Sequence, residues 1–173
     1  MEKLFKELSI SAIKLGDVPY TQEQVENSCL KTDAATESNF EVLEKRLGCK
    51  LPSDYKELML LTNGFPAPNS IEPSFLPLEK VNFLKDIDSE LIEAYSIEGI
   101  EEVGENLERS ILVGGVDEEQ YFLLIPPNKE GLKWRYWKFA NWIPGEEPYE
   151  NLRHYFKTVI EFNETEFSLE NES

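Results

Sequence analysis

The fold is decided by residues 38–64, which read SNFEVLEKRLGCKLPSDYKELMLLTNG. Apolar residues at positions i, i+3 and i+7 predict that the stretch begins with a helix that has one apolar face. These residues are Phe40, Leu43 and Leu47. Ser38 followed by Glu41 has the spacing of a capping box, which predicts where the helix begins. Gly48 stands where a left-handed residue commonly ends a helix, so the first helix is predicted to end there.

A second helix is predicted to begin at Pro52, because proline has a backbone angle suited to the first helical turn. Its expected apolar face consists of Tyr55, Leu58, Met59 and Thr62. Asn63 and Gly64 then end the helix. Two packed helices of this kind resemble a helix-turn-helix only loosely, since the DNA-binding form needs basic recognition residues, and Glu57 with the overall negative charge argues against it.

The rest of the chain predicts strands followed by a helix. Strand patterns occur at 78–84, 111–113, 121–125 and 132–139, with turn residues between the last three. In the last strand, Trp134 and Tyr136 alternate with Trp137 and Phe139, so the two pairs face opposite sides of the sheet. A closing helix over about 149–162 has an apolar stripe of Leu152, Tyr155, Phe156, Val159 and Ile160.

The predicted fold class is therefore α+β: one domain in which N-terminal helices and a C-terminal helix pack on a central antiparallel sheet. Residues 1–36 are expected to be a polar lead-in with a short helix, which begins at a capping box of Thr21 and Gln24. The domain proper is placed at 37–162, and residues 163–173 are expected to form a fraying acidic tail.

Length and charge narrow the possible functions. The chain has 173 residues, enough for one domain with a substantial core. Seventeen Lys and Arg face 34 Asp and Glu, a formal charge of −17. Because such a surface repels phosphate and anionic lipid, nucleic acids and membrane surfaces are not expected partners. With no apolar segment of signal-peptide or membrane-spanning length, the chain is expected to be cytoplasmic.

No residue pattern predicts a metal, a cofactor or a catalytic site. Cys29 and Cys49 are the two cysteines and are expected to be reduced thiols, and His154 is the one histidine, so a zinc site is not expected. Acidic residues from Asp86 to Glu90 are spaced as at the start of a calcium loop, but the glycine and the closing glutamate of that loop are absent. Among 34 carboxylates some pair always lies at a workable distance, which is no evidence of catalysis. We expect no enzyme.

The strongest functional signal from the residues is the stretch 86–108, which contains nine acidic residues and no Lys or Arg. They are Asp86, Asp88, Glu90, Glu93, Glu98, Glu101, Glu102, Glu105 and Glu108. Such a run is either a solvated face or a surface that binds a positively charged partner, and the sequence leaves both interpretations open. The tryptophans Trp134, Trp137 and Trp142 are mostly expected in the core, with room for one exposed interface anchor.

Residues 43–58, with Asn63 and Gly64 after them, resemble the signature of the SUKH superfamily, which includes fungal regulators of the Smi/Knr type and many bacterial immunity proteins. The resemblance implies a single α+β domain that binds a toxin protein and blocks it. The resemblance implies structural roles for the motif residues, as core residues, helix caps and the start of a helix. It does not assign them to a toxin-binding site. They are Leu47, Gly48, Leu51, Pro52, Tyr55, Asn63 and Gly64.

Charge and resemblance together lead to one hypothesis. A nuclease toxin holds a polyanion in a basic cleft, which an acidic immunity protein, or antitoxin, can occupy. The residues expected to contact it are Glu98, Glu101, Glu102, Glu105 and Glu108, with Trp137 or Trp142 as an aromatic anchor. The alternative is a Smi/Knr-like regulatory or scaffold protein that binds endogenous partners, as in the control of cell-wall synthesis. The sequence leaves the toxin's identity and the oligomeric state open.

Overall fold

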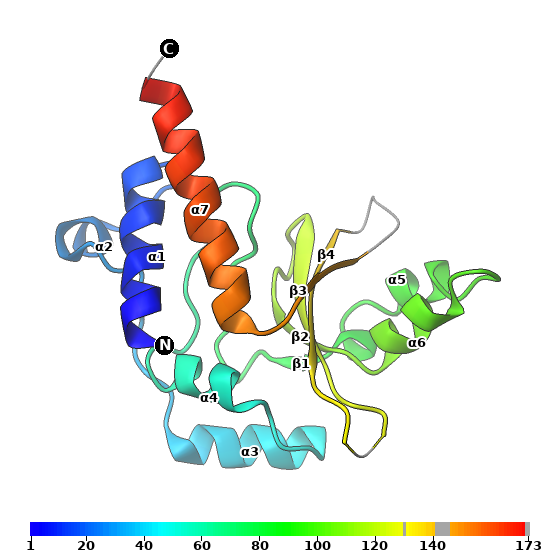
Figure 1. Cartoon of the computed structure of the whole chain (residues 1–173). Coiled ribbons are helices and arrows are strands. Elements are labelled where there is room, and N and C mark those ends of the chain that lie inside the picture. The colour runs from blue at the N-terminus through cyan, green and yellow to red at the C-terminus, as the bar shows by residue number, and fades with distance from the viewer. Residues whose placement is uncertain (130, 141–145, 172–173) are drawn as a thin grey trace.

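The computed structural model describes residues 1–129, 131–140 and 146–171. Its centre is an antiparallel sheet whose five strands lie in chain order, β1-β2-β3-β4-β5 (Figure 1). The strands are β1 (Asn82–Phe83), β2 (Ile111–Gly114), β3 (Gln120–Ile125), β4 (Arg135–Ala140) and β5 (Glu146–Tyr149). The antiparallel meander predicted from the turns between the strands is confirmed.

Alternation along the strands gives the sheet two apolar faces. In the register of β3 and β4, Leu124 lies opposite Tyr136 and Leu123 lies opposite Trp137. Leu124 and Tyr136 belong to the larger core, whereas Leu123 and Trp137 belong to a smaller core on the other side. The predicted division of β4 residues between two faces is confirmed, and both faces are buried.

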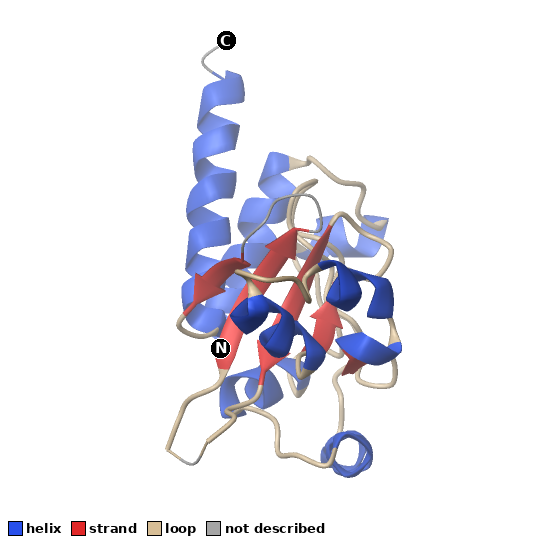
Figure 2. Cartoon of the chain, turned by 90° about the vertical axis from the view of Figure 1, so that its right-hand side faces the viewer, coloured by secondary structure: helices blue, strands red, loops and turns tan. Residues whose placement is uncertain are grey.

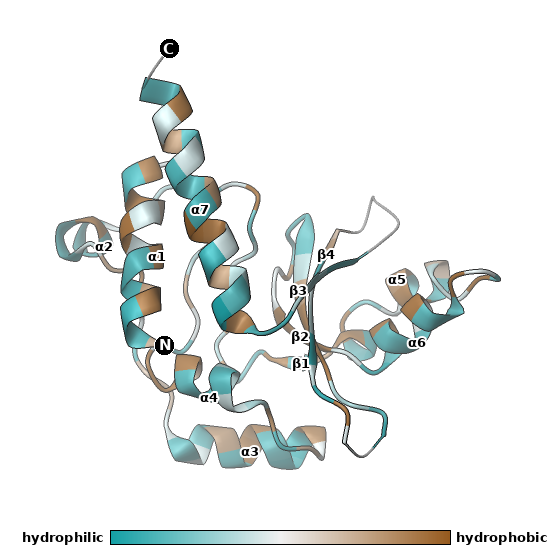
Figure 3. Cartoon of the chain, viewed as in Figure 1, coloured by the Kyte–Doolittle hydropathy of each residue, from teal (hydrophilic) through white to brown (hydrophobic). Residues whose placement is uncertain are grey.

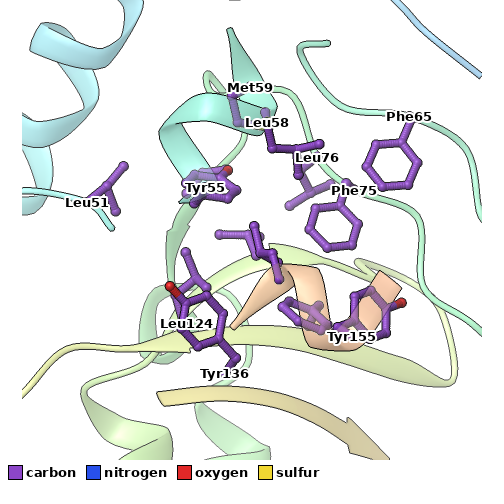
Figure 4. Packing of buried hydrophobic residues seen from close by; sticks show 14 of the residues in the cluster. Leu51, Tyr55, Leu58, Met59, Phe65, Phe75, Leu76, Leu124, Tyr136 and Tyr155 are labelled. Atoms are coloured by element: carbon purple, nitrogen blue, oxygen red, sulfur yellow. The ribbon is translucent and has the colours of Figure 1, made fainter. Parts of the chain in front are cut away.

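Helices cover the first face and enclose the larger core (Figure 4). They are α1 (Glu2–Leu15), α3 (Glu37–Leu47), α4 (Ser53–Met59) and α7 (Leu152–Asn171), with α2 (Gln22–Asn27) at the periphery. Tyr55 from α4, Phe75 from the loop before β1 and Tyr155 from α7 meet over the sheet. Phe75 and Tyr155 have ring centroids 6.1 Å apart, which places the predicted α7 stripe directly on the core.

Two short helices cover the opposite face, α5 (Ser89–Ala94) and α6 (Glu101–Glu108), after a 3-10 turn η1 (Leu84–Asp86). Figure 2 shows them in front of the strands, on the side away from α7. The domain therefore has three layers, with the sheet in the middle, and the fold class predicted from the sequence is confirmed.

Residues 1–36 contribute more structure than the expected polar lead-in. α1 is a full helix whose residues Phe5, Leu8 and Ala12 are buried against the larger core. It packs along α7 (Figure 1). α7 also continues to Asn171, whereas the sequence predicted its end near Phe162, because α1 gives the later turns a partner.

Three boundaries differ from those predicted. The capping box of α3 is formed by Thr36 and Asn39, two residues earlier than expected, while the Thr21–Gln24 box is confirmed. The strand expected at 78–84 shortens to Asn82–Phe83, because Pro77 and the turn after it lie before the sheet. Tyr149 ends β5 and does not begin the last helix.

Candidate interaction surface

We call residues 86–108 the acidic arm, since they hold α5, α6 and all nine acids of the base-free stretch. The arm is attached to the sheet by apolar residues that the charges surround. Leu91, Tyr95 and Leu107 are buried in the smaller core with Trp137 and Phe139. The Tyr95 and Phe139 rings lie edge to face, 5.1 Å apart. The arm is therefore a packed layer of the domain.

Local chemistry fixes the position of both arm helices. Asp88 caps α5, since its Oδ1 accepts a hydrogen bond from the Leu91 N–H at 3.0 Å. Its Oδ2 accepts a hydrogen bond from the Tyr121 hydroxyl of β3 at 2.8 Å. Gly104 lets α6 approach the end of α5, because a Cβ there would lie 2.7 Å from the Tyr95 carbonyl oxygen. The acidic side chains of the arm therefore project from helices whose positions are fixed.

The five glutamates predicted to contact a partner all lie on the arm with exposed side chains: Glu98, Glu101, Glu102, Glu105 and Glu108. Figure 3 colours much of α6 as hydrophilic. At the start of α6, backbone N–H groups of Glu101 and Gly99 lower the pKa of the Glu101 carboxyl, so it is ionised at neutral pH. Asp88 differs from the other acids of the arm in being half-buried.

Cations from outside the arm offset part of its charge. Arg135 at the start of β4 forms an ion pair with Glu102 at 3.3 Å. Arg109 follows α6 and donates hydrogen bonds to the Pro126 carbonyl and to the Asn106 side chain. In the parts of the chain that the structure describes, no ion pair within 4.0 Å involves the other four predicted glutamates. Most acidic side chains of the arm therefore have no direct ion-pair partner among the described residues, although Arg109 lies close enough to interact electrostatically with Glu105 and Glu102.

Trp137, one of the two expected aromatic anchors, is not on this surface. Trp137 is 3% exposed and packs in the smaller core, so its proposed role as a surface anchor is wrong. The arm itself covers the face of β4 from which Trp137 projects, and the sequence did not predict that covering layer. Trp142 lies outside the described residues.

The motif residues occupy structural positions. Leu47, Leu51 and Tyr55 are buried in the larger core. Gly48 has φ 69° at the end of α3, and Pro52 precedes the first residue of α4. These positions agree with the roles that the resemblance implied.

Asn63 and Gly64 attach the long loop before β1. The Asn63 Oδ1 accepts a hydrogen bond from the Leu78 N–H at 2.9 Å. Gly64 has φ 85°, and a Cβ there would lie 2.7 Å from the Phe75 carbonyl oxygen. The Asn-Gly pair thus allows the loop to return close to the end of α4.

Sequence reasoning missed Glu44, a buried acid on α3. Its side chain is 9% exposed, and Oε1 accepts a hydrogen bond from the Leu51 N–H at 3.1 Å. Lys50 pairs with Oε2 at 2.5 Å. Burial alone would raise the pKa of Glu44, but the bonds from Lys50 and Leu51 outweigh it and lower that pKa. Its position four residues after Phe40, on the apolar face, was a signal of burial.

We predict that Glu44→Gln reduces the acid sensitivity of the fold. Since the folded pKa of Glu44 lies below the ordinary value of 4.5, its stabilisation is complete above that value and lost as pH falls through the folded pKa. The variant should lose about 1–2 kcal/mol of unfolding free energy at pH 7, and the gap to wild type should narrow as the pH falls below 4.5. Urea unfolding across this pH range measures both effects. Glu41→Gln, exposed on the same helix, is the matched control; a gap that stays constant with pH contradicts the prediction.

Asp54 is the second acid that the sequence reasoning missed. Its Oδ1 accepts hydrogen bonds from the Tyr136 hydroxyl at 2.6 Å and from the Tyr55 N–H at 2.9 Å. Its Oδ2 accepts one from the Leu152 N–H at 3.0 Å. One carboxylate therefore joins α4, β4 and the start of α7. The signal in the sequence was its place in the first turn of a helix, where acids bind free backbone N–H groups.

A buried ion pair joins the loop before β1 to the sheet. Lys138 of β4 lies 2.8 Å from Glu72 and 2.8 Å from Glu147 of β5. The Tyr155 hydroxyl donates to the second oxygen of Glu72 at 2.8 Å. Both acids are thus held by one lysine, which gives this cluster a structural role.

The described ranges contain neither a metal site nor a membrane-spanning helix. Within residues 1–129, 131–140 and 146–171, no group of three or more His, Cys, Asp or Glu side chains is placed to hold a metal ion. In the same ranges, no helix combines the length and the apolar composition needed to cross a membrane.

Comparison with known proteins adds one match. The model of the SMI1/KNR4 family (SUKH-1) matches residues 34–164. The match begins just before α3, spans the whole sheet and the acidic arm, and ends within α7. No curated protein matches the chain.

Proposed function

Since the chain belongs to the SMI1/KNR4 family (SUKH-1), we propose that it is an immunity protein that binds a basic toxin, a nuclease, and neutralises it through the acidic arm. Proteins of this family are generally non-catalytic and act as immunity or regulatory proteins that bind partner proteins. The proposed mode of action is occupation of the toxin's basic cleft, which excludes the nucleic acid.

The observation that carries the proposal is the exposed, largely unmatched charge of the arm. A packed layer of the domain displays it, so the acids keep their positions in the free protein and little ordering is needed on binding. Complementary charge raises association rates to as much as about 10⁸–10⁹ M⁻¹s⁻¹ at low salt. Rapid capture suits a protein that must bind a toxin before the toxin reaches nucleic acid in the cytoplasm, where we place its action.

Co-expression tests this function. The chain is produced together with a candidate toxic domain, chosen from any that is encoded beside its gene, and growth and complex formation are measured. We expect restored growth and a complex of one chain per toxin. A variant in which Glu98, Glu101 and Glu105 become lysine should protect less well than wild type.

The alternative is a regulatory protein of the Smi/Knr type that binds endogenous partners. It predicts no protection from the neighbouring toxic domain, and a complex with a host protein that forms in cells lacking any toxin. Either result contradicts the immunity function.

A further inference from the structure

The outer end of the acidic arm is a tight turn of defined type. The Ile100 N–H donates a hydrogen bond to the Ile97 carbonyl oxygen at 3.3 Å, which closes a four-residue turn over 97–100. Gly99, its third residue, has φ 97°, whereas Glu98 before it does not have a positive φ, so the turn is of type II. Figure 1 shows this turn between α5 and α6, at the end of the arm that points away from the sheet.

The turn is held in place on both sides. Ile100 is half-buried and packs against the smaller core. The Glu101 carboxylate accepts hydrogen bonds from the backbone N–H groups of Gly99 and of Glu101 itself, which lower the pKa of that carboxyl. Before the turn, the Ser96 hydroxyl donates a hydrogen bond to the Ile92 carbonyl oxygen at 2.7 Å. The turn therefore has its shape in the free protein, and little ordering is needed when a partner binds.

Ile97 differs from its neighbours on the turn because its side chain is apolar and exposed. It is 56% exposed, and it is not among the residues that pack in or against the smaller core. Glu98 follows it directly, and Glu93 and Glu101 lie four residues to either side, all with exposed side chains. In the described part of the chain, no ion pair within 4.0 Å involves these three glutamates. An apolar centre with a charged rim is the composition typical of a binding hot spot.

We propose that Ile97 is the anchor of the acidic arm and enters an apolar pocket on the basic partner, where lysine or arginine side chains at the rim of the pocket face Glu98 and Glu101. The inference rests on the proposed function, because the partner is the same toxin. Nine acids without a base in 86–108 favour a basic rim. The exposed isoleucine favours an apolar pocket, since its burial removes apolar surface from water. Charge alone would let the arm bind any basic cleft, so the contact of Ile97 adds specificity.

The two kinds of contact act on different rate constants. Charge attraction acts at long range and speeds the encounter, whereas an apolar contact forms after the encounter and slows dissociation. Salt screens the attraction between exposed charges and does not screen an apolar contact. Ile97 should therefore determine the lifetime of the complex, while the glutamates of the arm determine its rate of formation.

Stopped flow with the candidate toxic domain used in co-expression tests the proposal, with excess unlabelled chain added to measure dissociation. Ile97→Ala should dissociate about 5- to 10-fold faster than wild type, at low salt and at about 0.5 M salt alike. Its association rate should stay within about 2-fold of wild type. Ile97→Val should restore most of the lifetime. The urea midpoint of Ile97→Ala should equal that of wild type, because the side chain lies outside both cores.

Val42→Ala is the matched control, because Val42 is an aliphatic residue, 66% exposed, on α3 and thus outside the arm. This variant should leave both rate constants unchanged. An equal effect of Val42→Ala and Ile97→Ala would assign the change to the loss of apolar surface in general and overturn the proposal.

Two further results would overturn it: dissociation of Ile97→Ala at the wild-type rate, or a change confined to its association rate. If reversal of the arm charges then still slows association, the proposed function stands and the anchor alone is wrong. If no complex forms with wild type, the proposed function fails and the anchor fails with it.

Discussion

Replacing Asp54 by alanine is expected to lower the free energy of unfolding by about 2–4 kcal/mol. The change removes the acceptor for the Tyr136 hydroxyl and for the N–H groups of Tyr55 and Leu152. The Tyr136 side chain is buried, and its pKa is raised by burial and then by Asp54, so the hydroxyl stays a neutral donor. A buried donor without an acceptor costs more than the net gain of an ordinary hydrogen bond.

Urea denaturation followed by circular dichroism measures this loss. Asp86→Ala is the control, because Asp86 is an exposed aspartate in another short helical element. The control should change stability by less than about 0.5 kcal/mol. If Asp54→Ala is no more destabilising than Asp86→Ala, Asp54 does not join the three elements as described.

The sequence predicted those parts of the fold that depend on a single local pattern of residues. The helix pair α3 and α4 follows from helical spacing around Gly48 and Pro52, and the structure confirms it. Alternation in β4 placed Tyr136 and Trp137 on opposite faces, as found. In each case neighbouring residues alone carry the information.

α1 was missed although its pattern was present. Phe5, Leu8 and Ala12 have helical spacing, but charged residues around them made the segment look polar. Its burial depends on α7, which follows some 140 residues later in the chain. The same contact extends α7 past its predicted end, where Lys14 lies 4.1 Å from the centre of the Phe167 ring.

The acidic arm shows why the site was predicted only in part. Its charge was evident from the sequence, and the five glutamates are exposed. Its buried apolar side chains, Leu91, Tyr95 and Leu107, are too widely spaced among acids to predict a layer on the sheet. Since that layer covers Trp137, the error about Trp137 as an anchor followed from not predicting that the arm packs on the sheet. Of the two tryptophans among the described residues, Trp134, just before β4, is the partly exposed one.

Reversing Glu98, Glu101 and Glu105 to lysine is expected to slow association with the toxin at least about 10-fold at low salt. The variant changes the charge of the arm by six units without touching Leu91, Tyr95 or Leu107, so the fold should be kept. Charge at such a surface acts mainly on the rate of encounter, while the dissociation rate depends on closer contacts.

A matched control distinguishes the effect of the arm on the association rate from the effect of the total charge. Glu161, Glu164 and Glu170 are exposed on α7, across the sheet from the arm (Figure 1), and their reversal changes the net charge equally. This control should slow association far less than the arm variant. Equal slowing by both variants would mean that net charge alone, and not the arm, governs the encounter.

The most direct measurement is the association rate of wild type and the arm variant with the toxic domain, by stopped flow, over ionic strengths from about 0.02 to 0.5 M. We expect the wild-type rate to fall steeply with salt and the variant to be slower at low salt with a much flatter dependence, so that the two rates converge at high salt. Equal rates with the same salt dependence would contradict the claim that the acidic arm binds the toxin.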